Sequence, residues 1–177
     1  GKGANQAVAA LRAGAEVRFL TKVGHDPFGD RIYRDLVTEG LPVDGLLRDE
    51  SAPTGVALIV VDREGRNQIA VAPGSNQLLL PAVIEQHESF LTYGTVLLVQ
   101  LEIPIITVER ALRFAKAHGM MTILNPAPAC PLSDDLLRHV DERVDGLAAQ
   151  VVAARDPLEA DHPVPARAWR RRRRARA

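Results

Sequence analysis

Two nearly uninterrupted apolar runs, separated by a helix-forming segment, constrain the fold of this chain most. Residues 95–99 and 120–124 are almost wholly apolar, which is typical of strands buried on both faces of a parallel sheet. Residues 108–118 between them have helical periodicity, and Gly119 is suited to end that helix. A strand, a helix and a strand in this order predict a right-handed crossover within a doubly wound, mostly parallel α/β sheet.

The segments before residue 95 extend this pattern. Pro27 suits the first turn of a helix, and Asp26 before it can cap the free amides. Two apolar runs flank a turn signal at residues 62–65, which predicts a β-hairpin. In chain order, we expect a helix at residues 3–13, a strand at 17–23, a helix at 27–38, the hairpin at 54–71 and a helix at 81–88.

The composition is that of a globular domain without covalent cross-links. The chain has 177 residues, of which 46% are hydrophobic, enough for one domain with its own core. Cys130 is the only cysteine, which excludes an internal disulfide and favours a cytoplasmic location. The five histidines show no metal-ligand spacing, so we predict no protein-built metal site. Without a long apolar run or a signal-peptide pattern, neither membrane insertion nor secretion is expected.

The formal net charge of zero conceals two unlike parts. Residues 142–177 contain nine arginines, no lysine and five acidic residues, which leaves thirteen basic and seventeen acidic residues in positions 1–141. Helical and strand periodicity also fades after about residue 141. We therefore predict a partial α/β domain over residues 1–141, followed by a divergent tail rich in arginine and alanine that is disordered or a poorly packed helix.

Three short segments, in this order, carry a resemblance to a known family. Residues 1–7 (GKGANQA) lead into a helix, residues 22–30 (KVGHDPFGD) form a turn into the next helix, and residues 100–104 (QLEIP) follow a buried strand. Together they resemble the ribokinase branch of the PfkB-type sugar kinases. The resemblance covers residues 1 to about 141 and implies a ribokinase-like fold, incomplete here, in which the β-hairpin contributes to a lid.

The resemblance assigns four residues to sugar binding. Gly1, Lys2 and Asn5 match the first sugar-binding signature of the family, and Glu102 matches the acidic residue that accepts hydrogen bonds from sugar hydroxyls. Their chemistry agrees, because a site for a sugar needs donors and acceptors aimed from rigid backbone. Ligands of such sheets bind beyond the carboxyl ends of the strands, where Glu102 and Asn125 fall, although we expect Asn125 to be structural.

Two further regions are open to more than one interpretation. The turn at residues 24–30 either abuts the sugar pocket or only connects a strand to a helix, and we assign it no catalytic role. Residues 54–55 and 73–76 match family segments that help to build the lid and the sugar-side wall. Ordinary turn chemistry describes each of these two segments better when it is taken alone.

The implied activity of the intact enzyme is transfer of the γ-phosphoryl group of ATP to the 5-hydroxyl of D-ribose. The implied cofactors are ATP, Mg²⁺ and a monovalent cation, and lid strands of the family can form a homodimer interface. The family's late Gly-Ala-Gly-Asp segment, which supplies an anion hole and the catalytic Asp, does not occur in this sequence. We therefore assign no catalytic, cofactor-binding or metal residue. We expect a chain truncated at both ends that is inactive by itself and binds none of these cofactors well.

Three alternative functions stay open at this point. The chain can belong to another PfkB-type sugar or nucleoside kinase, such as a fructokinase. It can instead bind nucleic acid through the arginines of residues 170–176, although an unselected basic tail is the favoured interpretation because no folded basic surface accompanies them. It can also be a non-catalytic partner subunit that pairs through the edges of the hairpin.

Overall fold

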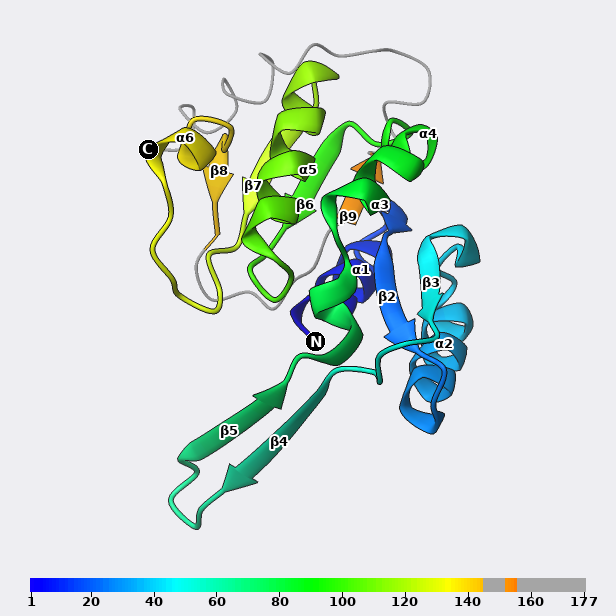
Figure 1. The fold of residues 1–177 in the computed structure, drawn as a ribbon, viewed down its shortest axis with the longest axis vertical. Helices are drawn as coiled ribbons and strands as arrows, with labels where there is room; N and C mark the ends of the chain where they lie inside the picture. Colours follow the sequence, from blue (N-terminus) through cyan, green and yellow to red (C-terminus); the bar gives the residue numbers. More distant parts are fainter. Residues whose placement is uncertain (145–151, 156–177) are drawn as a thin grey trace.

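A five-stranded sheet in the order β1-β9-β6-β7-β8 lies at the centre of the computed structural model, which describes residues 1–144 and 152–155 (Figure 1). β6 (Val96–Val99), β7 (Met121–Leu124) and β8 (Glu142–Arg143) are parallel neighbours. β9 (Val152–Arg155) pairs antiparallel with both β6 and β1 (Glu16–Phe19), so β1 and β6 run in the same direction. The prediction of a mostly parallel α/β sheet is confirmed, with one antiparallel strand inserted into it.

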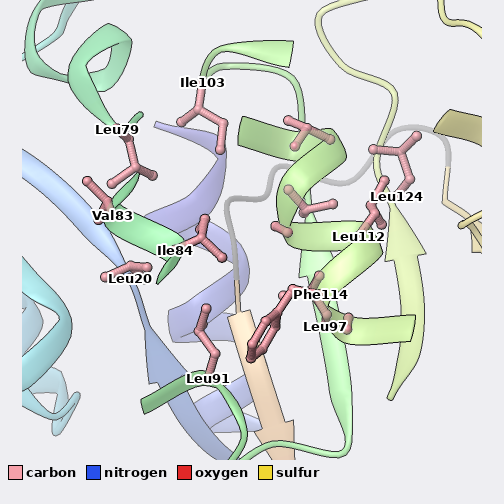
Figure 2. Close-up of a cluster of buried hydrophobic side chains, with 14 of the residues drawn as sticks. Leu20, Leu79, Val83, Ile84, Leu91, Leu97, Ile103, Leu112, Phe114 and Leu124 are labelled. Atoms are coloured by element: carbon pink, nitrogen blue, oxygen red, sulfur yellow. The ribbon is translucent and has the colours of Figure 1, made fainter. Parts of the chain in front are cut away.

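Helices cover both faces of this sheet. Successive residues of a strand point to opposite sides, so the central strands contribute side chains to a core cluster on each face. Leu97 and Val99 of β6 belong to the larger core cluster on one face, whereas Leu98 packs against a second cluster on the other. Figure 2 shows Leu112 and Phe114 within the larger cluster. The helices are α1 (Lys2–Arg12), α2 (Pro27–Glu39), α3 (Pro81–Gln86), α4 (Glu88–Leu91), α5 (Ile105–Ala117) and α6 (Asp134–Leu137), with short 3-10 helices η1 (Val43–Gly45) and η2 (Gly74–Leu78).

α5 is the crossover helix between β6 and β7, as the sequence predicts. It begins three residues before the predicted start, directly after Pro104. Its buried face follows helical spacing, since Val108, Ala111, Leu112 and Ala115 are all fully buried. The helix therefore packs on the sheet with the apolar stripe that its sequence contains.

The single strand predicted at residues 17–23 is wrong, because the structure contains two strands there. β1 ends at Phe19, and β2 (Thr21–Gly24) belongs to a separate two-stranded sheet with β3 (Leu46–Asp49), which the sequence did not predict. The neighbours Phe19 and Leu20 are both buried, but Phe19 packs into the smaller core cluster and Leu20 into the larger one. The segment therefore changes its pairing partner at Leu20, from β9 before this residue to β3 after it.

The predicted hairpin is confirmed and projects away from the rest of the molecule (Figure 1). It consists of β4 (Val56–Val61) and β5 (Asn67–Ala72), and Ile59 pairs with Ile69 near its middle. Every residue of both strands is exposed, and the large apolar side chains of the strands are exposed with the rest. The hairpin thus contributes an apolar surface rather than a share of the core.

The remaining predictions concern residues 81–88 and the tail. The helix at 81–88 is interrupted at His87 and forms α3 and α4.

Within the predicted tail, residues 142–143 and 152–155 form β8 and β9 of the central sheet, where the sequence suggests disorder or a poorly packed helix. Residues 145–151 and 156–177, which include the arginine run, lie outside the described residues. None of the described helices is long and apolar enough to cross a membrane.

Candidate functional site

A cavity of about 560 Å³ lies between the first turn of α1, the hairpin and the turn that follows β6. Gly1 and Lys2 contribute its side at α1, and Glu102 contributes its side at the end of β6. Val56 and Val71 of the hairpin line it with apolar surface. A concave site that combines much apolar surface with a few charged or polar groups is typical of small-molecule binding.

Lys2 and Glu102 meet directly inside this cavity. The backbone N–H of Lys2 donates to Glu102 Oε2 at 2.7 Å, and the Lys2 ammonium lies 3.4 Å from Glu102 Oε1. The Lys2 amide belongs to the first turn of α1, where backbone donors have no partner within the helix. Glu102 therefore satisfies one of these donors and places a negative charge at the positive end of the helix dipole.

Asn5 stands apart from the other three predicted residues. It follows Lys2 by three positions on α1, so the two side chains share one face of the helix. Gly1, Lys2 and Glu102 line the cavity, whereas Asn5 is not among its lining residues. The structure thus brings together three of the four residues predicted to bind sugar and places the fourth one helical turn away.

The carboxyl ends of β6 and β7 hold the turn that presents Glu102. The Asn125 N–H donates to the Val99 carbonyl at 2.8 Å, and the Leu101 N–H donates to the Ala127 carbonyl at 3.1 Å. Within the turn, the side-chain oxygen of Gln100 accepts from the Glu102 N–H. Since parallel strands end at one edge of a sheet, a site at this edge follows from the topology.

Gln100 and Asn125 form a buried polar pair beneath the turn. Their side chains share one side of the sheet, because Val99 and Leu124 pair in register immediately before them. Both side chains are fully buried, and Gln100 Nε2 and both polar atoms of the Asn125 amide have no hydrogen-bond partner among the described residues. Sequence reasoning missed the supporting role of Gln100, although a polar residue directly after an apolar run was a usable signal.

The base of the hairpin also belongs to the cavity. Thr54, Gly55 and Asn76 line it together with the hairpin strands. Single-residue turn chemistry did not predict this, because the segments 54–55 and 73–76 meet only when the hairpin closes. The match of these segments to a lid and sugar-side wall was the signal that pointed to them.

Lys22 also lines the cavity, but its charge is already paired. Its ammonium lies 2.9 Å from Asp49 Oδ2, and both side chains are largely buried. The Asp49 carboxylate accepts hydrogen bonds from the Ser51 hydroxyl, from Lys22 and from the Ser51 amide. In this order of effect, these bonds hold the pKa of the Asp49 carboxyl far below its ordinary value. The side chains of Lys2 and Glu102 are more exposed than those of Lys22 and Asp49, and both line the cavity, so they are the charged pair that a ligand can reach.

Comparison with known proteins gives the family. Residues 1–142 match the sequence profile described as pfkB family carbohydrate kinase, and the chain belongs to this family. The ribokinase of Haemophilus influenzae is 41% identical over 141 residues, which cover 80% of this chain and 46% of that protein. The deoxyribokinase of Salmonella typhi is 40% identical over 129 residues, which cover 73% of this chain and 42% of that protein.

Solved structures agree with this assignment and confirm the ribokinase-like fold. A ribokinase from Arabidopsis thaliana, solved with ribose and ATP, superposes with a TM-score of 0.75 at 26% identity, covering 82% of this chain and 48% of that one. A ribokinase from Giardia lamblia superposes with a TM-score of 0.74 at 28% identity, covering 82% and 46%. The chain spans about half the length of these relatives.

Proposed function

We propose that residues 1–142 form the sugar-binding part of an ATP-dependent kinase that phosphorylates D-ribose at its 5-hydroxyl. The observation that carries the proposal is the charged pair of Lys2 and Glu102 at the mouth of α1, inside a cavity of suitable size. The ribokinase relatives and the structure of a relative with ribose and ATP support the choice of substrate.

The hydrogen-bonding capacity of the pair suits a polyhydroxylated ligand. A carboxylate offers about four acceptor positions. In Glu102, one of them accepts from the Lys2 amide, and the second oxygen faces the Lys2 ammonium. The Lys2 ammonium has three donors, and the Lys2 side chain is about one-third exposed. We infer that sugar hydroxyls donate to Glu102 and that Lys2 donates to a sugar oxygen, with Gly1 allowing close approach. Asn5 is proposed to contribute from the neighbouring helical turn.

The phosphoryl-transfer half of the reaction is not assigned to any described residue. Transfer from ATP requires the γ-phosphate to be held in line while Mg²⁺ and backbone amides neutralise its charge. Within residues 1–144 and 152–155, no group of three His, Cys, Asp or Glu side chains is placed to hold a metal ion. We propose that ATP, Mg²⁺ and a monovalent cation act in the whole kinase through residues outside the matched segment.

Isothermal titration of the purified chain with D-ribose tests the proposal. We expect saturable binding that weakens about tenfold or more in Glu102→Gln, because a hydrogen bond to a charged group is worth about 1.5–3 kcal/mol. Glu109→Gln is the matched control, since Glu109 pairs with Arg113 on α5 and does not line the cavity. Unchanged ribose affinity in Glu102→Gln would contradict the proposal. Titrations with 2-deoxyribose, fructose and adenosine define the preferred substrate class.

We also propose a homodimer that forms through the hairpin. The hairpin residues nearest the body of the molecule line the cavity, among them Val56 and Val71. Leu58 and Val60, farther along β4, are not among the lining residues, and both are more than half exposed. Covering this apolar face with a second copy would remove it from water. We further propose a cytoplasmic location, which the single cysteine supports because disulfides are rare there.

A further inference from the structure

The hairpin is attached to the body of the molecule at the turn that follows β2. The Thr54 N–H donates to Asp26 Oδ2 at 2.6 Å, and the Gly24 N–H donates to the Thr54 hydroxyl at 2.9 Å. These contacts connect residues that are 28 and 30 positions apart in the chain. Thr54, which precedes the first strand of the hairpin, thereby both donates to the turn and accepts from it.

The segment that follows the second strand of the hairpin is attached at the same place. The Ser75 N–H donates to the Pro53 carbonyl at 2.8 Å, and the Ser75 hydroxyl donates to the Lys22 carbonyl at 3.0 Å. Ser75 is fully buried, unlike the strands of the hairpin. Both ends of the hairpin are thus held at the end of β2, while all residues of its two strands are exposed.

Asp26 serves two elements at once. Its Oδ1 accepts from the Gly29 N–H at 2.8 Å and caps α2, while its Oδ2 accepts from Thr54. The Thr54 amide, and next the Gly29 amide, hold the pKa of the Asp26 carboxyl below its ordinary value. One ionised carboxylate therefore joins the start of α2 to the base of the hairpin.

The packing at this joint leaves no room for adjustment. A Cβ on Gly29 would lie 2.1 Å from the Gly24 carbonyl oxygen and 2.8 Å from the Thr54 hydroxyl. A Cβ on Gly24 would lie 2.6 Å from the Thr54 nitrogen. Because backbone packs directly against backbone here, Thr54 cannot shift unless the turn moves with it.

We propose that Asp26 is a positioning residue of the sugar site, which fixes Thr54 and through it places the hairpin wall over the cavity. Thr54, Gly55 and Val56 are consecutive and all line the cavity that contains Lys2 and Glu102, whereas Asp26 does not line it. The inference rests on the proposed function, because it gives the cavity a sugar as its ligand. None of residues 24–30 lines the cavity, so in this proposal the turn acts on the pocket only through Thr54.

Two substitutions separate the two roles of Asp26. Asp26→Asn keeps one oxygen for the cap of α2 but replaces the other by an amide NH₂, which cannot accept from the Thr54 N–H. Asp26→Ser offers a single hydroxyl, which is an effective helix cap but is too short to serve both elements. Asp62→Asn is the matched control, because Asp62 accepts from the Glu64 and Arg66 amides at the far turn of the same hairpin and does not line the cavity.

Amide hydrogen exchange and ribose titration give two independent readouts. In both Asp26 variants, we expect exchange at residues 54–56 to rise about tenfold while the amides of α2 stay protected, since one charge-assisted hydrogen bond is lost. Ribose affinity should fall about five- to tenfold in these variants and should be unchanged in Asp62→Asn. Circular dichroism verifies that each variant is folded.

Three outcomes would overturn the inference. Exchange at residues 54–56 that equals that of the unsubstituted chain would show that Asp26 does not hold Thr54. Loss of protection in α2 alone would make Asp26 only a helix cap. Equal weakening of ribose binding by Asp62→Asn would show that any disturbance of the hairpin has the same effect. If the unsubstituted chain binds no ribose, the proposed function fails, and faster exchange at residues 54–56 would still establish the attachment of the hairpin.

Discussion

At the scale of single residues, the cavity region is organised by carboxylates that bind two groups each. Glu102 accepts a hydrogen bond from the Lys2 amide and forms an ion pair with the Lys2 ammonium, and Asp26 accepts from Thr54 and Gly29. The residue type is visible in the sequence, but the partners of Glu102 and Thr54 lie far away along the chain. These contacts therefore depend on the fold, while their chemistry depends on the side chain.

Asp49 gives a prediction about pH. Its Oδ1 accepts from the hydroxyl and amide of Ser51, and its Oδ2 accepts from Lys22. Because its pKa is lowered in the folded state, the stability that it contributes is present above about pH 4 and is lost as the pH falls toward the folded-state value. Urea unfolding should show that Asp49→Asn is less stable than the unsubstituted chain at pH 7, with a smaller difference at pH 3.

The control for this prediction is Asp35→Asn. Asp35 lies 3.6 Å from Arg31 in an exposed pair on α2, and such pairs contribute little to stability. We expect Asp35→Asn to behave like the unsubstituted chain at both pH values. A difference for Asp49→Asn that is equally large at pH 7 and pH 3 would be inconsistent with a role for the ionised carboxylate.

At the scale of elements, periodicity predicted α5, β6, β7 and the hairpin, because each carries its own pattern of apolar side chains. It predicted one strand instead of β1 and β2, because the division at Leu20 depends on the pairing partners of the two halves, which are β9 and β3. β3 was missed, since Leu46 is its only fully buried residue. The short strands that need a partner from elsewhere in the chain were thus the least predictable.

The hairpin carries the prediction at this scale. Replacing Leu58 by lysine places a charge on the exposed apolar surface of the hairpin outside the cavity lining, where a second copy is proposed to bind. Burying an unpaired charge is costly, so the Leu58→Lys chain should be a monomer under conditions in which the unsubstituted chain is a dimer. Size-exclusion chromatography with light scattering measures the mass of each.

Glu64→Lys is the comparison for Leu58→Lys. It introduces the same residue into the turn of the hairpin, where Glu64 is exposed and pairs with Arg66. This variant should remain a dimer. An unsubstituted chain that is monomeric at every concentration tested would contradict the proposed assembly, and so would a Leu58→Lys chain that is still dimeric.

At the scale of the whole molecule, the described residues form a five-stranded sheet, two two-stranded sheets and a cavity that is lined by residues no later than Pro128. Lys2, Thr54 and Glu102 come from three distant parts of the sequence and meet there. The arginine run at residues 170–176 begins more than forty positions after Pro128, the last residue that lines the cavity. Sugar binding and any charge interaction of the tail are therefore separable by deletion.

Deletion of residues 167–177 tests this separation. We expect the D-ribose affinity of the shortened chain to stay within about twofold of the original value, because all lining residues are retained. A parallel titration with duplex DNA at low and high salt measures the tail, since contacts to phosphates weaken steeply with salt. A large loss of ribose affinity on deletion would mean that the tail belongs to the sugar site.

The sequence by itself determined the buried strands, the crossover helix, the hairpin and the chemistry of Lys2 and Glu102, because periodicity and residue type are local properties. Only the tertiary structure decided that β9 separates β1 from β6, that Asn5 lies outside the cavity, and that Asp26 reaches Thr54. Each of these features joins segments that are distant in sequence. Such contacts form only when the chain closes on itself, so no local pattern encodes them.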